Sequence, residues 1–446
     1  MHLPKTKKNK FDLLIITPSS FKKTLKKLVS HKVRFNIKTD IITLDEIFNS
    51  KFFPLEGRDT PEQIKYFIKN SYDFWKIKYV LLVGGHKQLP VRYIHNFDRY
   101  PSNPEVLEPP YISDLYYADI YDSKGNFSTW DSNNDGKFGQ WEGNSAQDKN
   151  IDLKPNVCIG RLPCKNRFEV KIIIKKIINY ELKTYGKPWF KKIVAAGGNT
   201  HPEIGNFLEG EADILESLKY LEDFKQDKLF VSKGNLNRLN LIKSINKGCG
   251  FLLLVGHSNP PFWTTSPPNA KEFEWIPKFS ISHMIFLTNK SKLPILISSG
   301  CRNSAFDTNP FNLIKNPYLS YYWMDCIRNP WNWAITRKYS GGAIASLGSS
   351  GLGYGKYEPI TGGKADAFSF LIPEFFKEYN VNKVDILGQI WYNLIHSYLK
   401  KYTIDWNTPS LDVKTNDAKP DVINARTVQQ FILLGDPTLK IGGYKK

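Results

Sequence analysis

The sequence predicts an α/β fold in which mostly parallel sheets are flanked by helices and form two subdomains side by side. The first 85 residues alternate an apolar run, a helical pattern and a second apolar run, which is the order of a right-handed parallel unit. Later apolar runs are short and continuous, as in parallel strands buried on both faces. Helical patterns lie between or after them, so both layers expected of an α/β fold are present.

The amino-terminal elements follow in order. Residues 11–17 predict a strand, residues 20–31 a lysine-rich amphipathic helix and residues 79–85 a second strand. Before that second strand, Thr60-Pro-Glu-Gln63 supplies an N-cap, a proline at the first helical position and a capping-box glutamine. Residues 99–152, rich in Pro, Asn, Gly and Asp, predict a long irregular excursion of the kind that serves function or is ordered by a ligand.

A boundary near Lys187 divides the chain into subdomains 1–187 and 188–446. A helix over 167–185 ends the first, stopped by Gly186. In the second subdomain the sequence predicts strands at 193–196, 251–255, 295–298 and 341–347. It predicts helices at 207–224, 365–379 and 384–401. The glycine-rich residues 346–355 predict a mobile loop.

Composition excludes several classes of function. No uncharged apolar run approaches about 18 residues, so no membrane span is expected. The net charge of +19 comes from lysines scattered along the chain, and we expect no nucleic-acid partner. Five cysteines, few and odd in number, indicate reduced thiols and a cytoplasmic location. No signal peptide is seen; secretion is the alternative if a leader is missing.

Two strand ends carry the candidate chemistry. Phe251-Leu-Leu-Leu-Val-Gly-His257 and Pro294-Ile-Leu-Ile-Ser-Ser-Gly-Cys301 each place a reactive side chain where a buried strand ends. Ligands of open α/β sheets bind beyond the carboxyl ends of the strands. The cysteine and histidine could therefore face one substrate, although a buried structural cysteine and a strand-capping histidine are the alternatives.

In the catalytic interpretation, His257 withdraws the proton of the Cys301 thiol and later protonates the leaving amine. The backbone N–H groups of Ser258 and Cys301 would hold the oxyanion.

A third pattern predicts a structural calcium ion. Asp131-Ser-Asn-Asn-Asp-Gly-Lys-Phe-Gly-Gln-Trp-Glu142 matches a twelve-residue calcium loop, with glycine at position 6 and an apolar residue at position 8. The predicted ligands are Asp131, Asn133, Asp135, Lys137 and Glu142. Neither flank looks helical, so we expect a lone loop that fastens the excursion; an Asx-turn loop without an ion is the alternative. No organic cofactor is expected.

These motifs together resemble the gingipain-type cysteine peptidases, in the clan of caspases, legumain and clostripain. The similarity runs nearly the full length, from Phe11-Asp-Leu-Leu-Ile-Ile-Thr-Pro18 through Gly160-Arg-Leu-Pro163 and both strand-end motifs to Leu433-Leu-Gly-Asp-Pro-Thr-Leu439. The resemblance implies a caspase-hemoglobinase fold, with residues 188–446 as the catalytic subdomain and protein or peptide substrates.

The resemblance also implies an endopeptidase that uses His257 and Cys301 as its dyad. Members that cleave after Arg or Lys carry an acidic residue in the primary specificity pocket, and Asp213 lies in the similar segment; Trp263 is the second expected substrate-binding residue. The chain departs from the family at Ser258, where glycine usually follows the histidine, and Glu203 lies only near the place of the acidic residue that supports the histidine in some members. A pseudo-peptidase that binds peptides without cutting is the alternative function.

Overall fold

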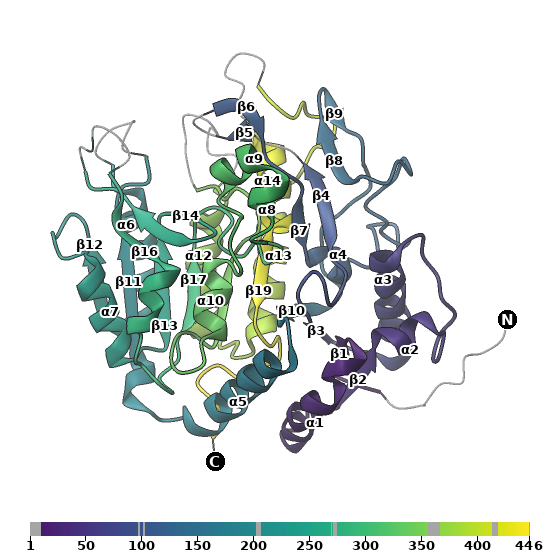
Figure 1. Cartoon of the computed structure of the whole chain (residues 1–446), viewed down its shortest axis with the longest axis horizontal. Coiled ribbons are helices and arrows are strands. Elements are labelled where there is room, and N and C mark those ends of the chain that lie inside the picture. Colours follow the sequence, from purple (N-terminus) through teal and green to yellow (C-terminus); the bar gives the residue numbers. More distant parts are fainter. Residues whose placement is uncertain are drawn as a thin grey trace.

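The computed structural model describes residues 10–96, 99–100, 103–201, 207–268, 270, 274–355, 366–412 and 418–445. Two parallel sheets dominate it (Figure 1). The amino-terminal sheet has the strand order β10-β3-β1-β2 and is parallel throughout. Its strands are β1 (Leu13–Thr17), β2 (Thr39–Thr43), β3 (Tyr79–Val83) and β10 (Cys158–Leu162).

The second sheet has six strands in the order β12-β11-β13-β17-β18-β19. It is parallel except for its last strand, which runs antiparallel to β18. The strands are β11 (Lys192–Gly197), β12 (Lys225–Phe230), β13 (Phe251–Val255), β17 (Ile295–Ser298), β18 (Ala345–Ser349) and β19 (Phe431–Leu434). All residues of β13 and β17 are buried, as their continuous apolar sequences predict. These two strands are neighbours at the centre of the sheet.

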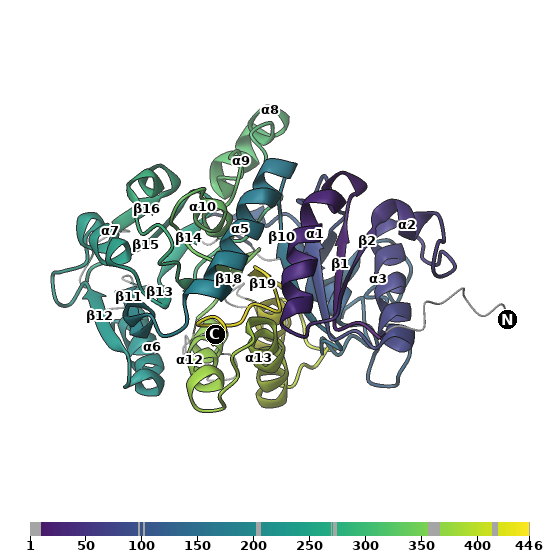
Figure 2. The ribbon, with the colours of Figure 1, turned by 90° about the horizontal axis from the view of Figure 1, so that it is seen from below.

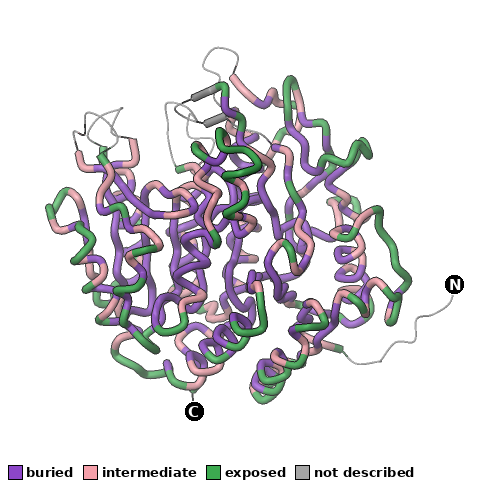
Figure 3. Tube along the Cα trace, in the orientation of Figure 1, coloured by how far each residue is buried: buried purple, intermediate pink, exposed green. Residues whose placement is uncertain are grey.

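Helices cover both faces of the six-stranded sheet. Figure 2 shows α7 and α10 on one face and α6, α12 and α13 on the other. Their bounds are α6 (Glu209–Leu218), α7 (Arg238–Lys247), α10 (Trp331–Arg337), α12 (Phe368–Asn380) and α13 (Leu387–Lys401). Buried residues follow the strands and the inner helix faces in Figure 3, so a layered core forms around each sheet.

The remaining α-helices of the described residues come from both halves of the chain. They are α1 (Ser19–Arg34), α2 (Leu44–Phe48), α3 (Thr60–Asn70), α4 (Leu115–Ala118), α5 (Arg167–Lys183), α8 (Asn312–Lys315), α9 (Pro317–Trp323) and α14 (Pro420–Gln429). The predicted N-cap of α3 was one residue off. Asp59, not Thr60, caps the helix by accepting a hydrogen bond from the backbone N–H of Glu62.

The two sheets meet edge to edge. At the facing edges, a Cβ atom on Gly160 of β10 would lie 2.5 Å from the carbonyl oxygen of Gly435, just after β19. All four strands of one sheet precede residue 187 and all six of the other follow it, although one apolar core cluster runs through both halves. The boundary itself stays a prediction.

The expected irregular excursion is more ordered than its composition suggested. Residues 92–146 contribute a four-stranded sheet in the order β7-β4-β8-β9, formed by β4 (Arg92–Asn96), β7 (Tyr111–Ser113), β8 (Phe138–Glu142) and β9 (Ser145–Ala146). A two-stranded ribbon, β5 (Arg99–Tyr100) and β6 (Asn103–Leu107), lies beside it in sequence. Residues 346–349 likewise belong to β18 rather than to a loop. Among the described helices, none is long and apolar enough to cross a membrane.

Candidate active site

Cys301 lies three residues beyond β17, in a turn that packs against the strand that follows β13. The turn depends on Gly300, whose φ of +109° suits glycine. A Cβ atom there would lie 2.5 Å from the Ser258 Oγ and 2.6 Å from the Ser258 nitrogen. The Ser258 hydroxyl also donates a hydrogen bond of 2.8 Å to the Cys301 carbonyl. The structure thus joins the two predicted strand ends directly.

His257 opens a hairpin that leaves the sheet after β13. The hairpin consists of β14 (His257–Asn259) and β15 (Phe262–Thr265), and β15 pairs in turn with β16 (Ile276–Ser280). The His257 Nε2 is 2.5 Å from the carbonyl oxygen of Thr200. A carbonyl can only accept, so Nε2 carries the proton of the neutral ring and Nδ1 is the nitrogen that can take one up. The Trp275 ring meets the imidazole edge to face, with centroids 5.3 Å apart.

The Cys301 side chain is half-buried, against an apolar cluster of Val106, Trp323 and Leu352. The pKa of the thiol is raised to about 11, mainly by burial and to a smaller extent by the carboxylate of Glu108. A contact of 3.8 Å from Sγ to the Gly353 carbonyl, together with the positive charges of neighbouring arginines, works in the opposite direction. In the free protein the group is therefore a thiol, and a base must remove its proton during attack.

The serine that replaces the family's glycine does not distort the backbone. Ser258 lies in β14 without a positive φ, and its side chain points to the Cys301 carbonyl. Its backbone nitrogen lies beside Gly300, close to the turn that carries the Cys301 nitrogen. The oxyanion role of these two N–H groups stays a prediction.

Sequence reasoning missed the residues that hold the histidine. Thr200, whose carbonyl accepts the hydrogen bond from the His257 Nε2, is itself fixed by Glu209 at the start of α6. The Glu209 Oε2 accepts hydrogen bonds from the Thr200 backbone N–H at 3.0 Å and from its hydroxyl at 3.3 Å. An acidic residue at the first turn of a helix was the available signal. Glu203, the residue considered earlier, lies outside the described residues.

The two expected substrate-binding residues have different fates. Asp213 is half-buried on α6, and its Oδ2 accepts a hydrogen bond of 2.6 Å from the Ser369 hydroxyl. The first turn of that helix approaches the end of β13, since a Cβ on Gly210 would lie 2.9 Å from the Val255 carbonyl oxygen. Trp263 is 0% exposed and belongs to a core cluster with Leu254 and Phe279.

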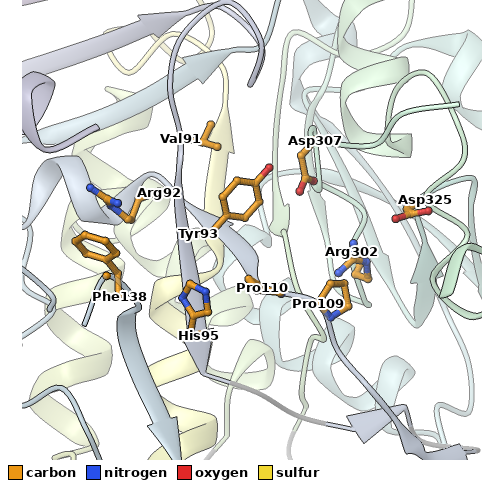
Figure 4. A pocket seen from close by; sticks show the side chains of 11 residues that line it. Val91, Arg92, Tyr93, His95, Pro109, Pro110, Phe138, Arg302, Asp307 and Asp325 are labelled. Atoms are coloured by element: carbon orange, nitrogen blue, oxygen red, sulfur yellow. The ribbon is translucent and has the colours of Figure 1, made fainter. Parts of the chain in front are cut away.

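A pocket of about 490 Å³ lies between β4 and the segment that follows Cys301. Figure 4 shows Tyr93, Arg302, Asp307 and Asp325 around it. Burial raises the pKa of the Asp307 carboxyl, whereas the charge of Arg302 lowers it. Both charged and apolar residues line the pocket, and one of them, Arg302, directly follows the cysteine in the sequence.

The predicted calcium loop folds as a set of Asx turns. The Asn133 Oδ1 and the Asp131 Oδ1 each accept the Asp135 backbone N–H at 3.1 Å, and the Asp135 Oδ1 accepts that of Lys137 at 2.8 Å. The guanidinium of Arg58 forms an ion pair of 2.8 Å with the buried Asp131. The carboxylates are thus partly satisfied by donors from the protein.

The predicted last ligand, Glu142, lies exposed at the far end of β8, four residues beyond Phe138. A strand advances by about 3.3 Å per residue, so about 13 Å of strand separate Glu142 from Phe138. The described residues contain no cluster of three His, Cys, Asp or Glu that could hold a metal. Calcium binding at Asp131, Asn133, Asp135, Lys137 and Glu142 stays a prediction.

A cysteine and a histidine thus follow the ends of neighbouring parallel strands, and the Nε2 proton of the histidine is held by a carbonyl. The model of Peptidase family C25 matches residues 6–442, and the chain belongs to that family. Gingipain R2 and Gingipain R1 of Porphyromonas gingivalis are each 23% identical to it over 313 residues, 68% of this chain. Those residues are 34% of Gingipain R2 and 25% of Gingipain R1, so the chain spans about a third or less of these relatives.

Solved structures confirm the fold. The crystal structure of the Arg-specific cysteine proteinase gingipain R superposes with a TM-score of 0.63 and 18% identity, covering 99% of this chain and 80% of that one. The complex of the pro- and mature domains of Porphyromonas gingivalis RgpB gives 0.63 and 17% identity, with coverages of 96% and 79%. The expected α/β fold with mostly parallel sheets and the family resemblance are both confirmed.

Proposed function

We propose that the chain is a cysteine endopeptidase that uses His257 and Cys301 as a dyad and cleaves after Arg or Lys. The observation that carries the proposal is the direct packing of the two strand ends, in which Gly300 fits against Ser258 and the Ser258 hydroxyl binds the Cys301 carbonyl. Two reactive side chains separated by 44 residues are thereby presented at one edge of the sheet.

The reaction would follow from these atoms. The His257 Nδ1 takes the proton of Cys301 as Sγ attacks the carbonyl carbon of the scissile bond. The negative charge that develops on the carbonyl oxygen is held by the backbone N–H groups of Ser258 and Cys301. The histidine then gives the proton to the leaving amine, leaving a thioester, which water hydrolyses with the same histidine as base.

Specificity for basic residues rests on Asp213. The first turn of its helix approaches the carboxyl end of β13 at Gly210, and its carboxylate, oriented by Ser369, is of the kind that accepts the charged head group of an arginine or lysine. The relative whose structure covers this chain is described as Arg-specific, which supports the same choice. We expect Asp213→Asn to lower kcat/KM for substrates with Arg or Lys by at least tenfold.

The pseudo-peptidase alternative is favoured by one observation. Burial holds the pKa of Cys301 near 11, which leaves little thiolate in the free protein at neutral pH. A groove that binds a peptide without cutting it would have the same fold. Binding of the peptide must therefore bring about proton transfer to His257 if the protein is an enzyme.

Profiling with a peptide library separates the two functions. Wild-type protein should cleave after Arg or Lys, and Cys301→Ala should lose this cleavage. Cys326→Ala, which removes another half-buried thiol, is the matched control and should keep it. Equal residual cleavage by wild type and Cys301→Ala would refute the peptidase, and retained peptide binding would then support the binding module. Cytoplasmic location stays a prediction.

A further inference from the structure

Two serine hydroxyls hold the peptide groups on either side of Cys301. The Ser349 hydroxyl donates to the carbonyl of Gly300, and the Ser258 hydroxyl donates to the carbonyl of Cys301. Because each peptide group is planar and rigid, holding its carbonyl also fixes the direction of its N–H. The first group carries the Cys301 N–H, and the second carries the N–H of Arg302, which donates to the Gly351 carbonyl at 2.8 Å. Both backbone dihedrals of Cys301 are thereby restrained.

Ser258 and Ser349 belong to different strands. Ser349 ends β18, the strand beside β17, whereas Ser258 directly follows His257 in β14. Its hydroxyl is therefore a side-chain link between the backbone of the histidine strand and the backbone of the cysteine turn. The link is shielded, since Ser258 is 5% exposed, and glycine at position 300 leaves room for its Oγ.

We propose that Ser258 is a positioning residue, whose hydroxyl aligns Cys301 with His257 by holding the Cys301 carbonyl. The inference deepens the proposed function and rests on it. At this position the gingipain-type resemblance leads one to expect glycine, which has no hydroxyl to donate. In this chain the side chain adds a restraint that a glycine would not supply, in a site whose thiol must be aimed before it is deprotonated.

Removing the hydroxyl should weaken the chemistry and leave substrate binding unchanged. We expect Ser258→Ala to lower kcat about three- to tenfold with KM unchanged, the effect of one net hydrogen bond. Ser258→Thr keeps a hydroxyl and suits a strand, so it should recover most of the loss. Ser71→Ala is the matched control because Ser71, which directly follows α3 in the amino-terminal half, is also buried and also donates to a backbone carbonyl at 2.8 Å. It should leave kcat unchanged.

Covalent labelling of Cys301 tests alignment separately from turnover. A peptidyl acyloxymethyl ketone with arginine beside the ketone needs an aligned thiol and oxyanion donors, whereas iodoacetamide needs only an accessible thiol. In Ser258→Ala the labelling rate with the ketone should fall about three- to tenfold while the rate with iodoacetamide stays within twofold of wild type.

Two results would overturn the positioning role: equal kcat and ketone labelling in Ser258→Ala and wild type, or an equal fall with both reagents, which indicates a general structural loss. Failure of the proposed function looks different. In that case wild type itself shows no cleavage that depends on Cys301.

Discussion

The turn at Gly300 offers the sharpest test of how the site is assembled. In Gly300→Ala, the new Cβ would lie 2.5 Å from the Ser258 Oγ, 2.6 Å from the Ser258 nitrogen and 2.9 Å from the His257 carbonyl carbon. Two of these atoms belong to the backbone and cannot rotate away. The change therefore forces the cysteine turn and the histidine strand apart.

The cost has two parts. A non-glycine residue at φ +109° is strained by about 1 to 3 kcal/mol. Overpacking against the backbone of β14 adds about 1 to 3 kcal/mol. We expect Gly300→Ala to lower the free energy of unfolding by about 4 kcal/mol. We expect activity to fall by about a hundredfold or more, because a displacement of about 1 Å at a reacting group has that effect.

Gly125→Ala separates strain from contact. Gly125 has a φ of +81°, but a Cβ there would meet nothing within 4 Å. It should therefore lose about 1 to 2 kcal/mol from strain alone and keep full activity. Urea unfolding and peptide hydrolysis of both variants provide the comparison. If Gly300→Ala is no less stable than Gly125→Ala and cleaves peptides at the wild-type rate, the close packing of the two strand ends is not needed and the reasoning is wrong.

Three further predictions concern the thiol, the histidine and the loop. The rate of Cys301 alkylation in the free protein should rise about tenfold per pH unit and level off near pH 11, because burial keeps the thiol protonated; a midpoint near pH 8.5 in a pH series with iodoacetamide would contradict this. Glu209→Ala should lower kcat/KM about fivefold, because Thr200 loses the hydrogen bonds that hold its carbonyl against the histidine. Glu216→Ala, an exposed change on the same helix, should leave kcat/KM unchanged. Equal kcat/KM values for the two variants would refute the role of Glu209. If the loop binds calcium as its sequence predicts, the melting temperature in millimolar calcium should exceed that in chelator, and Asp135→Asn should abolish the difference; unchanged melting of the wild type would leave the Asx-turn interpretation.

Local patterns in the sequence were sufficient to predict the two central strands of the six-stranded sheet. β13 and β17 were predicted with their exact bounds because continuous apolar runs, ended by Gly and polar residues, have few alternatives to a buried strand. The sequence predictions failed where the paired strands are distant in the sequence. Within the predicted excursion, residues 99–152, three strands join β4 in a sheet, with pairings such as Ser113 to Arg92, which the abundant turn residues concealed.

The sequence by itself determined that a histidine and a cysteine follow two buried strands, and that the chain resembles a family using such a pair. Tertiary structure decided that β13 and β17 are neighbours, that Thr200 and Glu209 stand behind the histidine, and that Trp263 faces the core. It also decided that the second half of the predicted calcium loop forms β8, with Glu142 exposed at its end. The physical reason is that strand formation depends on residues a few positions apart, whereas strand order, side-chain direction and ligand geometry depend on packing between segments that the sequence separates.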